Sequence, residues 1–349
     1  MKDFDIIDLF LISALAITLV VSCSDVDLLD LNQIQSEPLE LHYLQRSESQ
    51  DLNLLILPEA YRQEDMLQFE GKAHDIFRIL QQIKPYCYLL DRMNIIYSTS
   101  TISESNELGS RKTAYGSSHI DGRTIFLDMD SVKQVVRRSG LQYERTVLLI
   151  LANTNEYVGC TRFFSDYTYA VCPADNRYTM TTIFHELGHA IGHLADEYAE
   201  YDTFPSKSAL AKIKEWQKEG DYLNITTDGY SIPWKEILAD PAYAAENTGV
   251  YLGGALYASG VYRSTSNSIM KGHLCGYNAV SRFLIYKRLM KFHTGVVPDY
   301  SDFRREDLSC NQLDFDWNKM IRSSKMNPQN PAGEALQPTS SYKHCIIRE

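Results

Sequence analysis

The sequence predicts an α+β fold in which a mixed, mostly parallel β-sheet packs on helices. Two apolar runs, at residues 52–57 and 146–152, are typical of buried strands. Between them, apolar residues recur at helical spacing over residues 66–83, which indicates an amphipathic helix. The third observation is the pattern His-Glu-Leu-Gly-His at residues 185–189, which is expected on a helix that follows the second strand.

The composition is that of a globular protein and excludes several other classes. Of the 349 residues, 44% are hydrophobic and 23% are charged, which separates the chain from disordered and fibrous proteins. The formal net charge of −11 leaves no basic surface that would follow a phosphate backbone, so no nucleic acid is expected as a partner. No period in the sequence indicates a repeat architecture. The length allows one large domain or two small ones.

The N-terminus has the features of an export signal. Residues 10–21 form an uninterrupted apolar run, which is long enough for a signal peptide but short of the roughly 20 residues that cross a bilayer as a helix. The run ends in Val-Val-Ser before Cys23, and this resembles the lipobox at which bacterial lipoproteins are cleaved and lipidated. We therefore predict a lipoprotein signal peptide over residues 1–22 and membrane attachment through a lipid anchor at Cys23.

This interpretation places the mature protein outside the cell, anchored at the bacterial outer membrane or the cell surface. The positive charge that usually starts a signal peptide is weak, because Lys2 is outnumbered by Asp3, Asp5 and Asp8. A plain signal peptide or an uncleaved signal anchor is the alternative.

The rest of the chain divides into a tether, a folded domain and a tail. Residues 23–50 are polar and acidic without a sustained period, and they are expected to form the lipidated N-terminus and tether. The folded domain is expected over residues 51–322, and residues 323–349 are expected to form a polar C-terminal tail. Within the domain, Pro58 is expected to end the first strand and Pro85 to end the first helix.

The remaining elements follow from shorter patterns. Residues 146–152 are apolar on both faces and are expected in the centre of the sheet, whereas residues 167–172 alternate less cleanly and suit an edge strand. A helix that starts at residues 179–182 is expected to carry the histidine pattern. Further expected elements are strands at residues 94–97 and 123–127, a polar loop at 98–118, and helices at 206–219 and 277–292.

Cysteines other than Cys23 leave the question of disulfides open. There are six of them, at positions 87, 160, 172, 275, 310 and 345. An even number permits disulfides in an exported protein, although six cysteines allow 15 full pairings. Cys160 and Cys172 flank one short segment and are candidates for a bridge across it. The alternative is that they are buried free thiols.

The histidine pattern carries the chemistry that the sequence predicts most sharply. On a helix, His185 and His189 lie one turn apart on the same face, so both imidazoles can bind one tetrahedral Zn²⁺. Glu186 lies to the side of that pair, where its carboxylate can take a proton from metal-bound water. Glu186 is therefore the predicted general base. The alternative is a pair of surface histidines on an amphipathic helix.

A catalytic zinc needs a third protein ligand, and three residues are candidates. Asp196 is the first choice, Glu197 the second and His193 the third. On an unbroken helix, Asp196 would lie about 10 Å along the axis from His189 and could not bind the same ion. The assignment therefore requires the chain to turn at Gly192. The alternative for Asp196 is a carboxylate that orients a ligand histidine.

Residues 185–198, with the sequence HELGHAIGHLADEY, resemble the zinc-site segment of the bacterial IgA-peptidase family of secreted metallo-endopeptidases. The resemblance covers about residues 51–293, which is most of the mature chain. Its supporting segments lie at residues 52–61, 147–157, 224–226, 232–235, 260–263 and 267–270.

The resemblance implies a metzincin-like zincin, a fold in which a methionine turn lies beneath the zinc. Met270 would be that methionine, and an ordinary core methionine is the alternative. Tyr198 and Tyr262 are candidates for the phenol that stabilises the oxyanion.

The expected function is that of a zinc-dependent endopeptidase that hydrolyses protein substrates outside the cell. Zn²⁺ would be held by His185, His189 and Asp196, with zinc-bound water as the nucleophile and Glu186 as the base. The main alternative is a non-catalytic envelope lipoprotein that binds host protein or glycan through a peptidase-like fold. A zinc hydrolase acting on other bonds is a third possibility.

Overall fold

The computed structural model describes residues 37–49, 51–120, 124–164, 167–310, 315–323 and 347–348. The predicted signal peptide over residues 1–22 and the predicted anchor at Cys23 lie outside the described residues. Within the described residues, no helix combines the length and the apolar character needed to cross a membrane.

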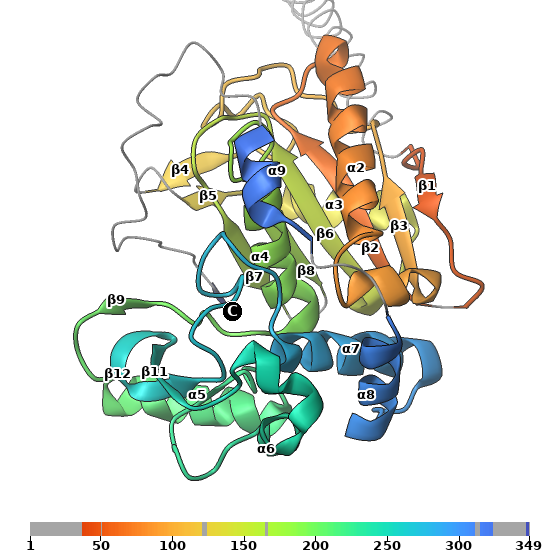
Figure 1. Ribbon diagram of the computed structural model, residues 1–349. Helices are drawn as coiled ribbons and strands as arrows, with labels where there is room; N and C mark the ends of the chain where they lie inside the picture. Colours follow the sequence, from red (N-terminus) through yellow and green to blue (C-terminus); the bar gives the residue numbers. More distant parts are fainter. Residues whose placement is uncertain are drawn as a thin grey trace, which may run out of the picture.

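A seven-stranded sheet forms the centre of the molecule (Figure 1). Its four middle strands run parallel to one another, and antiparallel strands flank them on both sides. This confirms the predicted mixed, mostly parallel sheet. In spatial order the strands are β1 (His42–Gln45), β3 (Met93–Tyr97), β2 (Leu52–Glu59), β6 (Thr146–Ala152), β8 (Thr168–Pro173), β7 (Cys160–Phe163) and β13 (Ile347–Arg348).

Helices cover both faces of this sheet, because its central strands are apolar on both sides. Every residue of β2 and β6 is buried. One face packs against α2 (Met66–Leu80), α4 (Thr179–Gly192) and α7 (Ala279–Thr294), and the other packs against α3 (Met129–Ser139). The buried positions of α2 recur at the predicted helical spacing, at residues 66, 69, 73, 76 and 80.

Pro58 does not end the first strand as predicted, because it lies inside β2. The backbone of Ile56 faces β3, since its carbonyl accepts from the N–H of Ser98, and Pro58 faces the same side two residues later. The pairing of β2 with β3 ends at Ile56, whereas the pairing with β6 continues to Glu59. Proline therefore costs no hydrogen bond at this position.

The predicted edge strand is also wrong. The strand predicted at residues 167–172 is β8, and it lies inside the sheet between β6 and β7. Strand β7, which is closer to the edge, was not predicted from the sequence. Strand β7 has four residues, Cys-Thr-Arg-Phe, and this length is too short to show an alternating pattern. The strand predicted at residues 123–127 corresponds to β5 (Thr124–Phe126), which forms a separate hairpin with β4 (Ser118–Ile120).

Two strands lie where the sequence predicts a tether and a tail. Strand β1 falls within the predicted tether and pairs with β3, where the ring of His42 stacks on Tyr97 with centroids 4.8 Å apart. Its side chains are half-buried or exposed, so no apolar pattern marks it in the sequence. Strand β13 falls within the predicted tail and pairs with β7. Short edge strands of this kind need little apolar character.

After α4 the chain builds a second region, which lies below the large sheet in Figure 1. A small sheet has the order β10 (Ile225–Thr226), β12 (Leu256–Arg263) and β11 (Tyr251–Gly254), with β9 (Ala199–Tyr201) also paired to β12. The helices of this region are α5 (Lys207–Glu219), α6 (Lys235–Ala239) and α8 (Tyr300–Ser309). Helix α9 (Trp317–Ser323) lies instead beside α4 in Figure 1, where the rings of Trp317 and Phe184 have centroids 5.8 Å apart. Short 3₁₀ helices along the described chain are η1 (Gln63–Asp65), η2 (Tyr86–Tyr88), η3 (Leu90–Arg92), η4 (Tyr143–Arg145) and η5 (Pro241–Glu246).

The candidate bridge between Cys160 and Cys172 does not form, and both residues are buried. They lie on the neighbouring strands β7 and β8, where Cys160 is in register with Val171 rather than with Cys172. Cys87 and Cys310 are free thiols, with their sulfurs 3.3 Å apart. Cys345 lies outside the described residues.

Candidate metal centre

Helix α4 places the two histidines of the motif side by side. His185 and His189 are four residues apart and therefore point from the same helix face, with their Nε2 atoms 3.0 Å apart. Both side chains are buried, at 3% and 0% exposure. The helix itself is buried on nearly all sides, because it lies between the large sheet and α7.

The chain turns at the end of α4 and brings Asp196 back to the histidines. The Oδ1 atom of Asp196 lies 3.1 Å from Nε2 of His185 and 3.2 Å from Nε2 of His189. The turn is made by His193, which has left-handed backbone angles of φ 49° and ψ 41°. Gly192, at which the sequence predicts the turn, is still helical. A Cβ at Gly192 would lie 2.8 Å from Cγ1 of Ile285, so packing against α7 requires the glycine.

The hydrogen bonds of the two imidazoles fit a metal ion. Nδ1 of His185 lies 2.8 Å from the carbonyl oxygen of Ile269, and Nδ1 of His189 lies 2.7 Å from that of Leu194. Carbonyl oxygens only accept, so each Nδ1 carries the proton and each Nε2 presents a lone pair. Two lone pairs and the carboxylate of Asp196 therefore face one another, an arrangement that requires a cation between them.

The spacing of these three atoms agrees with a zinc site. Ligand atoms on a tetrahedral zinc lie roughly 3.3 Å apart, as follows from bond lengths of about 2.0–2.1 Å. The observed separations are 3.0, 3.1 and 3.2 Å. In the described part of the chain, His185, His189 and Asp196 form the one group of three or more potential ligands that is close enough to hold a metal.

Without a metal, a proton takes part of this role. Burial by itself disfavours the charged form of His189, but the adjacent Asp196 carboxylate outweighs burial and raises the pKa of His189 to about 9. Burial also disfavours the charged form of Asp196, but the two histidines outweigh it and hold the pKa of Asp196 well below its usual value. A metal ion therefore competes with a proton for this site.

Contacts from distant parts of the chain hold the loop that carries Asp196. The side chain of Asn224 accepts from the N–H of Ala195 at 2.8 Å and donates to its carbonyl at 2.9 Å. The carbonyl of Asp196 accepts from the N–H of Ala255 at 2.8 Å. The N–H of Glu197 donates to the carbonyl of Met270 at 2.9 Å. The position of the third candidate ligand thus depends on residues from three later segments.

The two other candidates for the third ligand do not join the cluster. Glu197 accepts hydrogen bonds from the hydroxyl of Ser268 at 2.6 Å and from the amide of Asn224 at 3.1 Å. Burial raises the pKa of the Glu197 carboxyl despite these donors. His193 points elsewhere, and its Nδ1 lies 2.7 Å from Oδ1 of Asp221. Glu197 instead braces the loop that presents Asp196.

Glu186 is completely buried and lies against the short strand β7. The hydroxyl of Thr161 donates a hydrogen bond of 2.6 Å to Oε2 of Glu186, and this bond holds one carboxylate oxygen in position. Thr161 could not be predicted from the sequence, because the short strand β7 has no recognisable pattern. Asn224 lies in a segment that resembles the family, but its role in holding the loop depends on a contact across 29 positions that no local pattern indicates.

Met270 and the two tyrosines named by the family resemblance have different neighbours. Met270 is buried directly against α4, since a Cβ at Gly188 would lie only 2.5 Å from its sulfur. The ring of Tyr198 lies 6.3 Å from the ring of His185. Tyr262 lies on β12, and its ring faces Gly229, at which an added Cβ would lie 3.8 Å from the ring.

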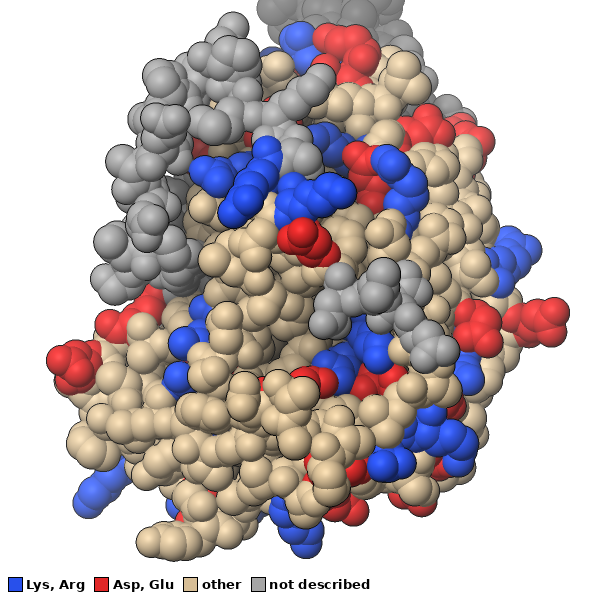
Figure 2. All heavy atoms as spheres, in the orientation of Figure 1, with Lys and Arg blue, Asp and Glu red and all other residues tan. Residues whose placement is uncertain are grey.

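The face shown in Figure 2 is hollowed near its middle, in the region between α4 and the small sheet of Figure 1. Uncharged side chains surround most of this hollow, and lysine, arginine, aspartate and glutamate gather toward the rim.

A family model described as IgA Peptidase M64 matches residues 43–242 of this chain. The match covers more than half of the chain and includes His185, Glu186, His189 and Asp196. Comparison with the curated proteins gives no match.

Proposed function

The chain belongs to the IgA peptidase M64 family, as the sequence predicts, and from this premise we propose that it is a zinc-dependent endopeptidase that acts on protein substrates outside the cell. Membership in this family makes the protein a metallopeptidase. The observation that carries the finer proposal is the convergence of His185 Nε2, His189 Nε2 and Asp196 Oδ1 within 3.2 Å of one another.

His185, His189 and Asp196 would hold the zinc ion, which supplies Lewis-acid polarisation of a carbonyl and lowers the pKa of a bound water. The carbonyls of Ile269 and Leu194 fix the tautomers of both histidines, so each ring presents Nε2 without rearrangement. A metzincin-like arrangement is supported by Met270, which packs against α4 at Gly188, the residue before His189.

Glu186 is the general base in this proposal. Its Oε2 atom is held by Thr161, while its neighbours on α4 are the two candidate ligands. The carboxylate would accept the proton of the attacking water and deliver it to the leaving amine. Because the side chain is completely buried, the proton would pass between donor and acceptor away from bulk solvent.

Replacement of Glu186 tests this role. We expect Glu186→Gln to reduce hydrolysis of a mixed peptide library by about 10²–10⁴-fold, which is the usual contribution of a general base. Zinc content should be unchanged, because Glu186 is not among the three candidate ligands. Glu215→Gln is the matched control, since Glu215 is exposed on α5. Unchanged hydrolysis by Glu186→Gln would disprove the mechanism.

Lipid attachment is a separate proposal, supported by the apolar run at residues 10–21 and by Cys23. We propose that the mature protein is anchored through Cys23 at the outer membrane or cell surface. Replacement Cys23→Ser should leave the protein uncleaved and without incorporated fatty acid. Incorporation of labelled palmitate into the Cys23→Ser protein would contradict this assignment.

A further inference from the structure

Two cysteines that the proposed peptidase chemistry does not use face each other from distant parts of the chain. Cys87 lies in the 3₁₀ helix η2, and Cys310 is the C-cap residue of helix α8, 223 positions later. Their sulfur atoms are 3.3 Å apart, and both residues are half-buried. The two sulfurs of a disulfide are about 2.05 Å apart, so a closing movement of about 1.2 Å separates this contact from a covalent bond.

Polar contacts hold the two segments that carry these thiols close together. Asp307, which lies three residues before Cys310, accepts a hydrogen bond of 2.9 Å from the hydroxyl of Tyr88. The carbonyl oxygen of Asp307 also accepts from the ammonium group of Lys84 at 2.8 Å. Tyr88 and Lys84 are one and three residues from Cys87. The approach of the two thiols therefore does not depend on the contact between the sulfurs themselves.

Asp307 is in turn fixed to helix α7. Its carboxylate is buried and accepts two hydrogen bonds of 2.8 Å from the guanidinium of Arg282. Burial disfavours the charged carboxylate, but Arg282 outweighs burial and holds the pKa of Asp307 below its usual value. The same guanidinium bonds Glu246 at 2.6 Å. The end of α8 that carries Cys310 therefore has a fixed position on α7, and η2 packs against it.

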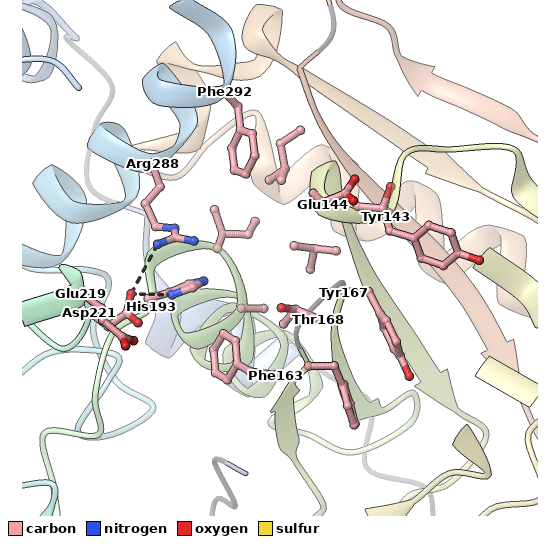
Figure 3. A pocket seen from close by; sticks show the side chains of 16 residues that line it. Tyr143, Glu144, Phe163, Tyr167, Thr168, His193, Glu219, Asp221, Arg288 and Phe292 are labelled. Carbon is pink, nitrogen blue, oxygen red and sulfur yellow. Dashed lines mark hydrogen bonds and ion pairs between the residues drawn. The ribbon is translucent and has the colours of Figure 1, made fainter. Parts of the chain in front are cut away.

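A second polar contact joins α7 to the chain after α5, and its geometry is poorer. Arg288 lies beside a cavity of about 410 Å³, and its guanidinium is 3.4 Å from Oδ1 of Asp221 (Figure 3). About a third of the Arg288 side chain is exposed to water, at 34%. Water weakens an ion pair of this kind, so it contributes little to stability. A covalent bond between Cys87 and Cys310 would hold the second region on the first more firmly.

We propose that Cys87 and Cys310 are an oxidation site, at which a disulfide joins η2 to the end of α8. The oxidant is a disulfide of the thiol-exchange class, which takes two electrons and both thiol protons and leaves as two thiols. Burial and the contact with Cys310 raise the pKa of Cys87 to about 12, so Cys87 is protonated at neutral pH and the exchange begins at Cys310. The bond persists outside the cell, so this inference rests on the proposed location and not on peptide cleavage.

The disulfide would enclose the candidate metal centre in a covalent loop. All three candidate ligands lie between positions 87 and 310, and so does Asn224, which holds the loop that carries Asp196. A cross-link that closes so long a loop removes many conformations from the unfolded chain. We therefore expect the thermal unfolding midpoint of the oxidised protein to lie about 5–10 °C above that of the reduced protein.

Peptide mapping of the unaltered full chain tests the bond directly. The purified protein is incubated with oxidised glutathione, alkylated and digested with trypsin. We expect the peptide of residues 79–92, which contains Cys87, to be joined to the peptide of residues 306–319, which contains Cys310. The joined peptides should separate when a reductant is added. Their absence after oxidation would overturn the proposal, and this measurement does not depend on the folding of a variant.

Three variants test whether the bond stabilises the protein. Cys87→Ser and Cys310→Ser should each lose the rise in unfolding midpoint that follows oxidation. Cys275→Ser is the matched control, because Cys275 is also half-buried and free, and this variant should keep the rise. An equal rise in all three variants would contradict the assigned pair.

Protein isolated from the producing cells and alkylated at once tests where the bond forms. We expect the joined peptides without any added oxidant. If they form with oxidised glutathione but are absent from the isolated protein, the proposed location outside the cell fails and the oxidation site stands. If they are present in a protein that cleaves no peptides, the peptidase proposal fails and the disulfide stands.

Discussion

The helix that carries His185 and His189 and the loop that carries Asp196 supply the same candidate centre, yet different contacts hold them. The histidines share one face of α4 because they are four residues apart on a hydrogen-bonded helix. The loop has no regular structure of its own, and it is fastened by Asn224, 29 positions from the Ala195 backbone that it bonds, and by Ser268, 71 positions from Glu197.

This difference has a physical consequence for how the two halves respond to change. Loss of a helical ligand removes a metal contact and leaves the helix in place, because the backbone bonds of α4 do not involve the histidine side chains. Loss of a residue that fastens the loop leaves all three candidate ligands in the chain, but Asp196 is then no longer held in position. Four sets of variants can break or sharpen this comparison.

The largest effect is expected from the helical half. His189→Ala should abolish the binding of one zinc ion per protein and lower peptide hydrolysis by more than about 100-fold. Loss of a residue that only hydrogen-bonds a metal ligand costs up to about 100-fold, and loss of the ligand itself should cost more. Zinc content after dialysis and cleavage of a mixed peptide library measure both. His74→Ala is the matched control, because His74 is exposed on α2. Retention of zinc by His189→Ala would show that α4 does not form the centre.

The loop half is tested by its two adjacent carboxylates. Asp196→Asn removes the charge that faces both histidines and should release zinc. Glu197→Gln should keep zinc but lower the free energy of unfolding by about 1–3 kcal/mol, because its new amide group faces the donors of Ser268 and Asn224. Zinc titration and thermal unfolding separate these outcomes. The reverse pattern would assign Glu197 as the ligand.

A smaller effect is expected when all three ligands remain but the loop loses its brace. Asn224→Ala removes both bonds to the Ala195 backbone and should weaken zinc binding by about 10–100-fold. Competition with a metal chelator gives the affinity. Asn318→Ala, at an exposed position of α9, is the control. Equal affinities in the two variants would show that the loop holds its conformation without Asn224.

The smallest effect concerns the packing that ends α4. Gly192→Ala should destabilise the protein by about 1–3 kcal/mol, because the new Cβ meets Ile285 and Leu194. Gly71→Ala on α2 should instead stabilise by about 1 kcal/mol, because no atom lies within 4 Å of the added Cβ and alanine favours helix. The thermal unfolding midpoint measures both. A rise for Gly192→Ala would mean that α7 shifts to admit the methyl group.

Large parts of the sheet and its helices follow from local patterns. Residues of β2 and β6 are apolar on both faces, and α2 is apolar along one stripe, because each must be buried against neighbours on those sides. Among the strands that were missed, β1 and β7 of the large sheet have four residues each and lie at or near an edge. Their pairing depends on backbone hydrogen bonds, which any sequence without proline can make.

The sequence by itself determined the half of the centre that lies within one helix, since the spacing of His185 and His189 fixes their common face. Only the tertiary structure decided the rest. It brought Asp196, rather than Glu197 or His193, close to the two histidines, and it placed Thr161 on Glu186 and the C-terminal strand on β7. The reason is that these contacts join residues far apart in the chain, and their geometry exists only after the two regions have packed together.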